Sequence, residues 1–381
     1  NSVLVGGTSD SIVSIGVPVT ANRIFISGAS TTPSWSTVTV KNVSNNIFLG
    51  INSGDAVTSG NDNHAFGISS LLNNTSGNNN TAFGLETLRN NTTGSNNTSF
   101  GTQSLFYNTN NHNSAFGTQS LFSNTTGTAN SAFGSFSFYS NVSGTNTSAF
   151  GYQTLYSNTT GDHNSSYGYQ SLYSNTTGSF NSGIGYQSLY SNTDGNNNVA
   201  VGDRALYLNI TGDDNCSLGF HSLFNNTASG NSSFGKDSLY TNTTGTNLAA
   251  FGYQALYSNI TGVNNSAFGY QTNFNNTNGA ANSSLGYKAL FSNTLGDDNC
   301  AIGINSLYAN TSGGYNTAVG SASLYHNISG NNNTAFGAES LFFNTAGDNS
   351  AFGYQAMFTN TNGTSNAAFG NQSLFGNTTG N

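Results

Sequence analysis

Large apolar residues recur at a fixed distance along this chain, and each is followed by a glycine. From residue 50 onward, twenty such glycines are separated by nineteen steps, sixteen of 17 residues and three of 16. Those that follow residue 50 begin with Gly67, Gly84, Gly101, Gly117, Gly134 and Gly151. No helical period of 3.6 residues survives this spacing, so the pattern predicts an array of short repeats without helices.

Other positions are equally constrained when this glycine is taken as position 0 of each repeat. In the nineteen repeats from Gly67 onward, position −2 is always small, position +4 is Leu in sixteen, and position +5 is aromatic in seventeen. Position +7 is always Asn, position −4 is Asn in seventeen, and position +8 is always β-branched. Two strands are predicted, near −3 to +1 and +3 to +6, with an Asn-x-x-Gly turn closing each repeat.

A 17-residue repeat cannot bury its own apolar side chains, but a stack of such repeats can. Each coil would pair its backbone with the coils above and below, about 4.8 Å away, so that like residues form columns. The sequence therefore predicts an all-β protein, a parallel β-solenoid (β-roll) of about 20 coils with 17 residues per coil. Residues 46–381 form this rod, and residues 1–45 form a short N-terminal β segment.

The repeat positions also predict which columns lie inside the coil. Leu at +4, the β-branched residue at +8 and the large residue at −1 are expected inside, with small residues at −2 and +3 leaving them room. Asn at +7 is expected to form a buried amide ladder, each amide donating to the next coil. The predicted ladder comprises Asn74, Asn91, Asn108, Asn124, Asn141, Asn158, Asn175, Asn192, Asn209, Asn226, Asn242 and Asn259.

Aromatic residues at +5 directly follow the Leu at +4, so alternation would direct them outward. An exposed aromatic stripe usually marks an interface, which predicts lateral association, most simply as a trimer around a shared seam. Alternatively, each ring packs on the turn of its own coil and needs no partner. The candidate interface residues are Phe106, Phe122, Tyr139, Tyr156, Tyr173, Tyr190, Tyr207, Tyr240 and Tyr257.

Two short motifs resemble repeats of known fibrous proteins. Residues 198–202, Asn-Val-Ala-Val-Gly, resemble the head repeats of trimeric autotransporter adhesins, and residues 266–271, Ser-Ala-Phe-Gly-Tyr-Gln, are similar to repeats of phage and giant-virus tail-fibre-like proteins. The resemblance covers residues 46–381 and implies a parallel β-roll; in the adhesins the roll is left-handed and trimeric. The adhesin unit is shorter than 17 residues.

The N-terminal segment has a different pattern, with strands expected at residues 2–5, 11–15, 23–27 and 37–40. It could cap the first coil, whose edge would otherwise be exposed, or join a neighbouring subunit. The repeat pattern runs to Asn381 without a cap. We therefore expect either further chain or another subunit there, which would allow head-to-tail polymerisation.

The composition excludes several classes of protein. Only 5% of the residues are charged and the net charge is −8 with six Lys plus Arg, so neither nucleic acid nor an anionic membrane surface is an expected partner. No apolar run of 18 residues occurs, so no membrane insertion is expected. Disorder is not expected either, because 27 Phe and 19 Tyr recur largely in register.

Reactive side chains form no recognisable catalytic or metal-binding set. Cys216 and Cys300 lie five repeats apart, too far for a disulfide, and the five His are scattered over four columns. The acidic pairs at residues 213–214 and 297–298 supply too few oxygens for Ca²⁺. We expect no catalytic residue, no metal, no cofactor and no enzymatic activity.

The predicted function is a structural fibre subunit, a shaft outside the cell or on a cell or virion surface, built from copies of itself. A glycan-binding adhesin shaft or receptor-binding fibre, using outward Tyr at +1 and +5 and Gln at +2, is the alternative. Ice binding by the Thr pairs at +8 and +9 is a third. Glycosylation sequons begin at many +7 positions, with Asn124, Asn158, Asn175 and Asn242 as candidates, although the Asn persists where the sequon is lost.

Overall fold

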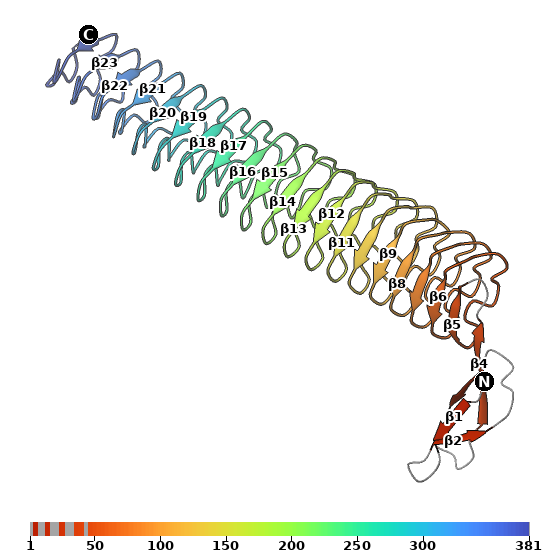
Figure 1. The fold of residues 1–381 in the computed structure, drawn as a ribbon. Helices are drawn as coiled ribbons and strands as arrows, with labels where there is room; N and C mark the ends of the chain where they lie inside the picture. Colours follow the sequence, from red (N-terminus) through yellow and green to blue (C-terminus); the bar gives the residue numbers. More distant parts are fainter. Residues whose placement is uncertain (1–2, 7–11, 16–22, 27–33, 42–44, 381) are drawn as a thin grey trace. The chain divides into compact units, whose positions relative to one another are not determined.

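The computed structural model describes the backbone of residues 3–6, 12–15, 23–26, 34–41 and 45–380, and the side chains of residues 45–380. This part of the chain contains strands β1 to β24 and no helix (Figure 1). Two compact units, residues 1–163 and 164–381, are described separately.

In the first unit, every strand from β5 onward pairs in parallel with the next, at the same position of each repeat. Phe66, for example, lies beside Phe83, and Ala132 beside Ala149. The strands are β5 (Ile47–Gly50), β6 (His64–Phe66), β7 (Thr81–Phe83), β8 (Thr98–Phe100), β9 (Ser114–Phe116), β10 (Ser131–Phe133) and β11 (Ser148–Phe150).

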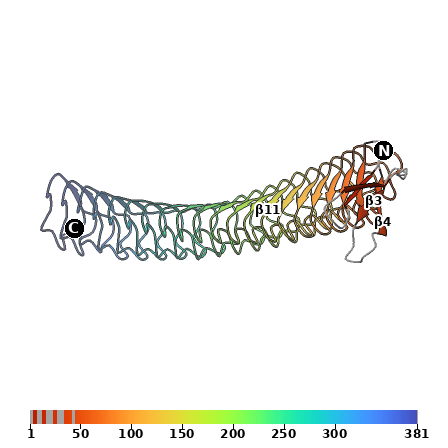
Figure 2. The same cartoon turned by 60° about the horizontal axis from the view of Figure 1, so that its bottom comes forward.

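The second unit is again a stack of coils (Figure 2), and its strands form parallel, in-register pairs. Its strands are β12 (Ser165–Tyr167), β13 (Ser182–Ile184), β14 (Val199–Val201), β15 (Cys216–Leu218), β16 (Ser232–Phe234), β17 (Ala249–Phe251), β18 (Ser266–Phe268), β19 (Ser283–Leu285), β20 (Cys300–Ile302), β21 (Thr317–Val319), β22 (Thr334–Phe336), β23 (Ser350–Phe352) and β24 (Ala367–Phe369). One strand per repeat, paired in parallel, confirms the predicted β-solenoid.

The second predicted strand of each repeat, near +3 to +6, is wrong. Residues there form consecutive turns, and the backbone enters the left-handed region at +2 and +4, as at Gln254 with φ 53° and Leu256 with φ 50°. Pairing with the neighbouring coil nevertheless continues through the turns, since the amide of Leu256 donates to the carbonyl of Thr272 at 3.1 Å. A left-handed Leu is costly in isolation and persists because surrounding coils fix it.

The interior is narrow and is filled mainly by small and polar side chains. Leu at +4 is fully buried, as predicted, except in the last coil, where Leu374 is 47% exposed. The small residues at −2 and +3, such as Ala250 and Ala255, are buried together with this Leu column. The predicted burial of positions −1 and +8 is wrong, since Phe268 is 39% and Ile260 is 42% exposed. Within a three-residue strand whose central residue points inward, both flanking side chains point outward.

The glycine at position 0 is required by its backbone and its surroundings. Gly101 has φ 128°, in the region that L side chains rarely adopt. A Cβ there would lie 2.5 Å from the carbonyl oxygen of Gly117 on the next coil. The turn glycines named from the sequence therefore allow the chain to leave each strand while neighbouring coils remain one strand spacing apart.

At the N-terminal end, β1 (Val3–Gly6) pairs antiparallel with β2 (Ile12–Ile15), and β3 (Arg23–Ile26) with β4 (Ser34–Lys41). The strand β4 also pairs antiparallel with β5. The edge of β5 that does not face β6 is therefore paired with β4 of the same unit. The four predicted strands overlap β1 to β4, although residues 2, 11 and 27 lie outside the described part, and the capping and subunit-joining roles stay predictions.

Candidate functional site in the side-chain columns

Asparagines at +7 form runs of buried, hydrogen-bonded amides within each unit, and these runs are interrupted where Oδ1 of Asn91, Asn209 and Asn327 has no hydrogen-bond partner among the described residues. In the second unit, Nδ2 of Asn242 donates to Oδ1 of Asn226 at 2.7 Å, and Asn259 donates likewise to Asn242 at 2.8 Å. In the first unit, Asn141 donates to Asn124 at 2.7 Å. The amides donate to the preceding coil rather than to the next one, and their side chains are fully buried.

The second proton of each ladder amide closes the turn of its own coil. Nδ2 of Asn259 donates to the carbonyl of Gly262 at 3.0 Å, three residues further on. Both amide protons are therefore used within the stack. Sugar attachment at Asn124, which donates to Asn108 at 2.7 Å and Gly127 at 3.0 Å, would break such bonds, so the folded stack does not offer this nitrogen as an acceptor.

The other three candidate glycosylation sites occupy the same column. Asn158, Asn175 and Asn242 are fully buried, and each donates to the glycine carbonyl of its own turn. Glycosylation of these positions would have to precede folding and would leave a sugar inside the coil.

A second buried amide ladder lies at −4. The backbone N–H of Asn299 donates to Oδ1 of Asn282 at 3.0 Å, and Nδ2 of Asn282 donates to the carbonyl of Gly296 at 2.8 Å. Sequence reasoning assigned no role to this column, although Asn in seventeen of nineteen repeats was the signal that could have identified it.

The three 16-residue steps are absorbed in the turn after the ladder asparagine. Asn226 donates to the carbonyl of Ala228, two residues on, whereas regular coils use the carbonyl three residues on. Asn108 and Asn344 use the carbonyls of Asn110 and Ala346 in the same way. The backbone register is kept across the shortened turn, but the ladder bond to the preceding coil is lost, since Oδ1 of Asn209 has no hydrogen-bond partner among the described residues.

Aromatic rings at +5 stack coil upon coil. In the second unit the stack runs from Tyr173 to Phe375, with centroid distances of 5.1 Å between Tyr257 and Phe274 and 5.3 Å between Tyr240 and Tyr257. These rings are half-buried, so simple outward alternation is wrong for this column. They stack on the rings of the neighbouring coils, and the packing of each ring on the turn of its own coil stays a prediction.

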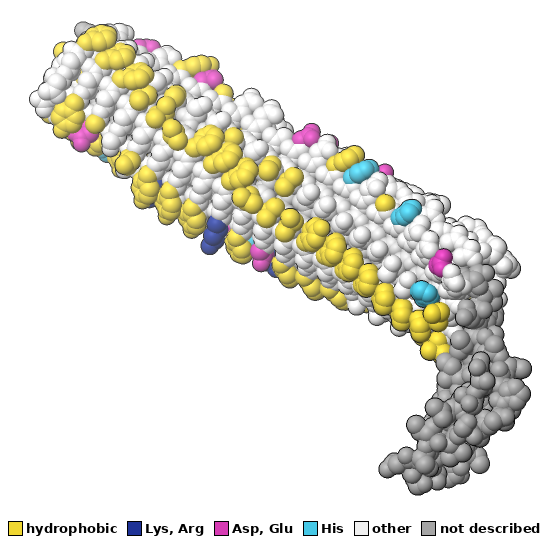
Figure 3. Space-filling view, viewed as in Figure 1, with side chains coloured by type: hydrophobic (Ala, Val, Ile, Leu, Met, Phe, Trp, Pro, Cys, Tyr) yellow, Lys and Arg dark blue, Asp and Glu magenta, His cyan; other side chains and the backbone are white. Residues whose placement is uncertain are grey.

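The candidate interface residues all belong to this column. In the first unit Phe106 stacks on Phe122, Phe122 on Tyr139, and Tyr139 on Tyr156, at 5.1 to 5.2 Å. A second stack occupies position −1, where Phe251 lies 4.8 Å from Phe268. Figure 3 shows the hydrophobic side chains as stripes that follow the stacking direction.

A third exposed column lies at +1, and an amide ladder at +2 separates it from the +5 stack. Tyr270 is 43% exposed and stacks on Tyr253 at 5.2 Å, while Nε2 of Gln271 donates to Oε1 of Gln254 at 2.8 Å. The Lys288 ammonium at +2 lies 5.5 Å from a +1 ring centroid and 5.2 Å from a +5 ring centroid, which places +2 between them. We call columns +1, +2 and +5 of the seven coils from Gly168 to Gly269 the Tyr/Gln face.

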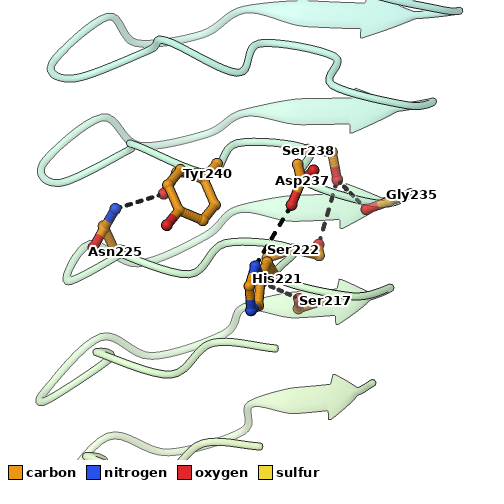
Figure 4. A network of polar contacts seen from close by, with 8 residues as sticks. All are labelled: Ser217, His221, Ser222, Asn225, Gly235, Asp237, Ser238 and Tyr240. Atoms are coloured by element: carbon orange, nitrogen blue, oxygen red, sulfur yellow. Dashed lines mark hydrogen bonds and ion pairs between the residues drawn. The ribbon is translucent and has the colours of Figure 1, made fainter. Parts of the chain in front are cut away.

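Charged residues interrupt the Tyr/Gln face over three consecutive coils. Asp203 and Arg204 occupy +1 and +2 of one coil, and Lys236 and Asp237 occupy the same positions two coils later. His221 lies between them, with Nδ1 3.7 Å from Oδ1 of Asp237 (Figure 4).

Burial is the main cause that lowers the pKa of His221, opposed by Asp237 and Asp203 and reinforced by Arg204 and Lys236. The nearby Ser222 and Ser238 are fully buried inside the coil, where their hydroxyl oxygens lie 3.4 Å apart. His221 lies on the outer Tyr/Gln face, so these residues form no nucleophile–base arrangement of the serine-hydrolase kind.

Thr hydroxyls at +8 are used by the backbone of the next coil. Oγ1 of Thr243 donates to the carbonyl of Ile260 at 3.1 Å, and Thr294 donates to Thr311 at 3.0 Å.

Burial raises the pKa of the Cys216 and Cys300 thiols, neither of which forms a disulfide.

Within the described residues, no group of three or more His, Cys, Asp and Glu side chains is placed to hold a metal ion, and no helix could span a membrane. Comparison with protein-family models gives no match, and comparisons with curated proteins and with solved structures give none either. The resemblance to adhesin head repeats and tail-fibre repeats therefore rests on the repeat pattern alone.

Proposed function

We propose that this protein is a structural subunit of an extracellular, cell-surface or virion fibre. The observation that carries the proposal is the continuity of its columns, since backbone pairs, buried amide ladders and ring stacks all run along one direction within each unit. Such a stack resists bending and leaves few unpaired backbone groups for a protease. Its work is mechanical, and it acts as a shaft rather than as a catalyst.

Self-association belongs to this proposal. In the second unit, large apolar side chains at −1 and +1 are exposed beside the half-buried rings at +5, and surfaces of this kind usually mark an interface. A lateral trimer, as in the adhesins whose head repeats the chain resembles, or head-to-tail joining would use these columns or the coil ends.

Glycan binding on the shaft is the second candidate, and the exposed Tyr270 beside the Gln254–Gln271 ladder favours it. Phenol hydroxyls and amides suit sugar hydroxyls. Each ring face is already covered by the next ring of its column, however, so this surface favours hydrogen bonding over ring stacking with a sugar.

Localisation and protease digestion together test the shaft proposal. Immunogold labelling of the source cells or virions should place the protein on extended surface fibres, and digestion of the purified full chain should leave the coil region from residue 46 onward intact under native conditions. Labelling confined to the cell interior, or early cleavage within internal coils, would overturn the proposal. An array of immobilised glycans probed with the same preparation tests the second candidate, which fails if no glycan is retained.

A further inference from the structure

The Tyr/Gln face of the second unit reads nearly the same in both directions from its central coil, which carries Phe220 at +1 and His221 at +2. Two coils away on either side stand Tyr186 with Gln187, and Tyr253 with Gln254. Three coils away stand Tyr169 with Gln170, and Tyr270 with Gln271. The +5 column is aromatic throughout and follows the same symmetry for two coils on either side, whereas three coils away Tyr173 corresponds to Phe274.

The charges invert across this centre. One coil before it, +1 is acidic and +2 is basic, in Asp203 and Arg204. One coil after it, +1 is basic and +2 is acidic, in Lys236 and Asp237. The face is therefore symmetric in its apolar and amide side chains and antisymmetric in its charges.

Two of these four charged side chains form no ion pair within the part of the chain that the structure describes. Neither Asp203 nor Lys236 forms an ion pair among the described residues, and Oδ1 of Asp203 is buried without a hydrogen-bond partner. The Lys236 ammonium lies over the rings of Phe220 and Tyr253, at 5.5 and 6.0 Å, rather than near a carboxylate. An unpaired, half-buried carboxylate is unfavourable unless a cation reaches it.

A twofold axis that passes through the central coil, perpendicular to the stacking direction, would give both Asp203 and Lys236 an oppositely charged partner. In an antiparallel pair of chains, +1 of one copy faces +1 of the other with the order of coils reversed. Asp203 then meets Lys236 of the second copy, and Arg204 meets Asp237 of the second copy. Tyr186 meets Tyr253 of the second copy, and Gln187 meets Gln254 of the second copy.

We propose that the Tyr/Gln face binds a second copy of this chain in an antiparallel, twofold-symmetric pair centred on the coil of Phe220 and His221. This rests on the self-association in the shaft proposal and names its partner and direction; the shaft itself requires only a stable stack of coils and survives if this pairing fails. The face indicates that the partner is a second copy of the chain. Only a copy presents the same order of side chains with the charges inverted, as the face requires.

A parallel pair fits these observations less well. With the axis along the stacking direction, each coil would face its own counterpart, so Asp203 would meet Arg204 of the second copy and Tyr columns would meet Gln columns. A parallel pair would not require the coils before His221 to resemble the coils after it. The mirrored order of side chains and the inverted charges are therefore explained by the antiparallel pair alone.

The expected association is reversible. Seven coils span six spacings, about 29 Å by the strand spacing, and three columns make a narrow strip. That area lies at the low end for specific protein interfaces, so we expect a dissociation constant of roughly micromolar size, weakened by salt.

Charge exchange in the full-length chain tests both the pairing and its direction. Asp203→Lys alone, or Lys236→Glu alone, places like charges opposite each other and should raise the dissociation constant roughly tenfold or more in sedimentation velocity. In the double variant D203K/K236E, the new lysine at 203 faces the new glutamate at 236 of the second copy, and dimerisation should return. In a parallel pair the same double variant keeps both repulsions.

Each outcome decides the proposal. Loss in the single variants with recovery in the double variant supports it, whereas loss without recovery overturns the antiparallel direction. A dimer indifferent to all three variants, or a monomer throughout the concentration series, overturns the interface itself. Circular dichroism of each variant verifies that the coils are still folded.

Spin-label distances give an independent measurement. With Cys216 and Cys300 replaced by serine, the residue commonest in their column, labels are attached through Ser174→Cys or Asn225→Cys, both beside the face. The antiparallel pair predicts a short separation for position 225 and an axial separation of about 29 Å for position 174. Equal short distances at both positions would overturn it.

Discussion

The inside and the outside of the coils follow different rules. Inside, +7 is Asn in all nineteen repeats and +4 is Leu in sixteen. Outside, +1 holds Tyr, Phe, Ile, Leu, Ser, Thr, Ala, Asn, Lys and Asp. An interior side chain must fit the coils on both sides as well as its own, so +7 and +4 keep one residue type almost throughout. Outward columns have solvent on one side and keep at most a residue class, as +8 does in being always β-branched.

The two interior amide columns refine this comparison. The −4 column accepts Leu248 and Thr147 in place of Asn, whereas the +7 column accepts no replacement. In coils with a regular turn, an amide at +7 donates both to the preceding coil and to its own turn, as Asn259 does to Asn242 and to Gly262. The carbonyl at the turn also accepts from −4, as Gly279 does from both Asn276 and Asn265, so the −4 bond is partly redundant.

The largest loss of stability is expected from a substitution that breaks the asparagine ladder at +7. Asn259→Leu removes the donors to Gly262 and Asn242 and the acceptor of Asn276, whose amide donates to it at 2.8 Å. At about 1–3 kcal/mol for each buried group left unpaired, the local free energy of unfolding should fall by about 3–5 kcal/mol. Hydrogen exchange of amides in the two flanking coils measures it.

Asn282→Leu is the matched control in the −4 column, where Leu already occurs at 248. It leaves the backbone N–H of Asn299 without its acceptor and should cost less, about 1–3 kcal/mol. Equal losses for the two variants would contradict the distinction between the two amide columns.

A smaller loss is expected in the apolar interior column. Leu256→Ala deletes a fully buried side chain in a narrow coil and should lower the local stability by about 2–4 kcal/mol. Leu256→Met, which copies Met357 at the same position, should cost less than about 1.5 kcal/mol. The same exchange measurement reports both, and a neutral alanine variant would refute close packing of this column.

The Leu column at +4 is interrupted by an Asn, and replacing that Asn should increase the stability of the coil. Asn273 occupies +4 between Leu256 and Leu290, and neither its Oδ1 nor its Nδ2 has a hydrogen-bond partner in the described structure. Asn273→Leu should therefore raise the local stability by about 1–2 kcal/mol, less than the full value because Asn tolerates the left-handed backbone better than Leu. Faster exchange in this coil would show instead that the amide is satisfied.

The smallest effect is expected on the outside. Ile260→Thr changes a side chain that is 42% exposed to the residue commonest in its column, and should alter the local stability by less than about 0.5 kcal/mol. Thermal unfolding of the variant and the parent chain provides the comparison. A loss as large as that of Leu256→Ala would mean that the +8 column is buried by a partner.

Prediction from the sequence worked where the repeat itself carried the information. The 17-residue period, the glycine at position 0 and the invariant Asn were enough for the solenoid and the +7 ladder. Strand alternation misled wherever the chain was not a strand: Leu256 and Tyr257 are neighbours, but left-handed turns place Leu inside and leave Tyr half-buried. The charge pattern around His221 was visible in the sequence but had no meaning until +1 and +2 were known to be adjacent outward columns.

The sequence by itself determined that like residues would stack, because a fixed period in an extended chain leaves no other way to bury its apolar side chains. The sequence also placed Leu at +4 and Asn at +7 inside, but only the tertiary structure decided how the columns at −1, +5 and +8 face. At +2 and +4 the backbone is left-handed, so consecutive side chains do not alternate between two faces as they do in a strand. These left-handed turns are stable only because the neighbouring coils hold them in place.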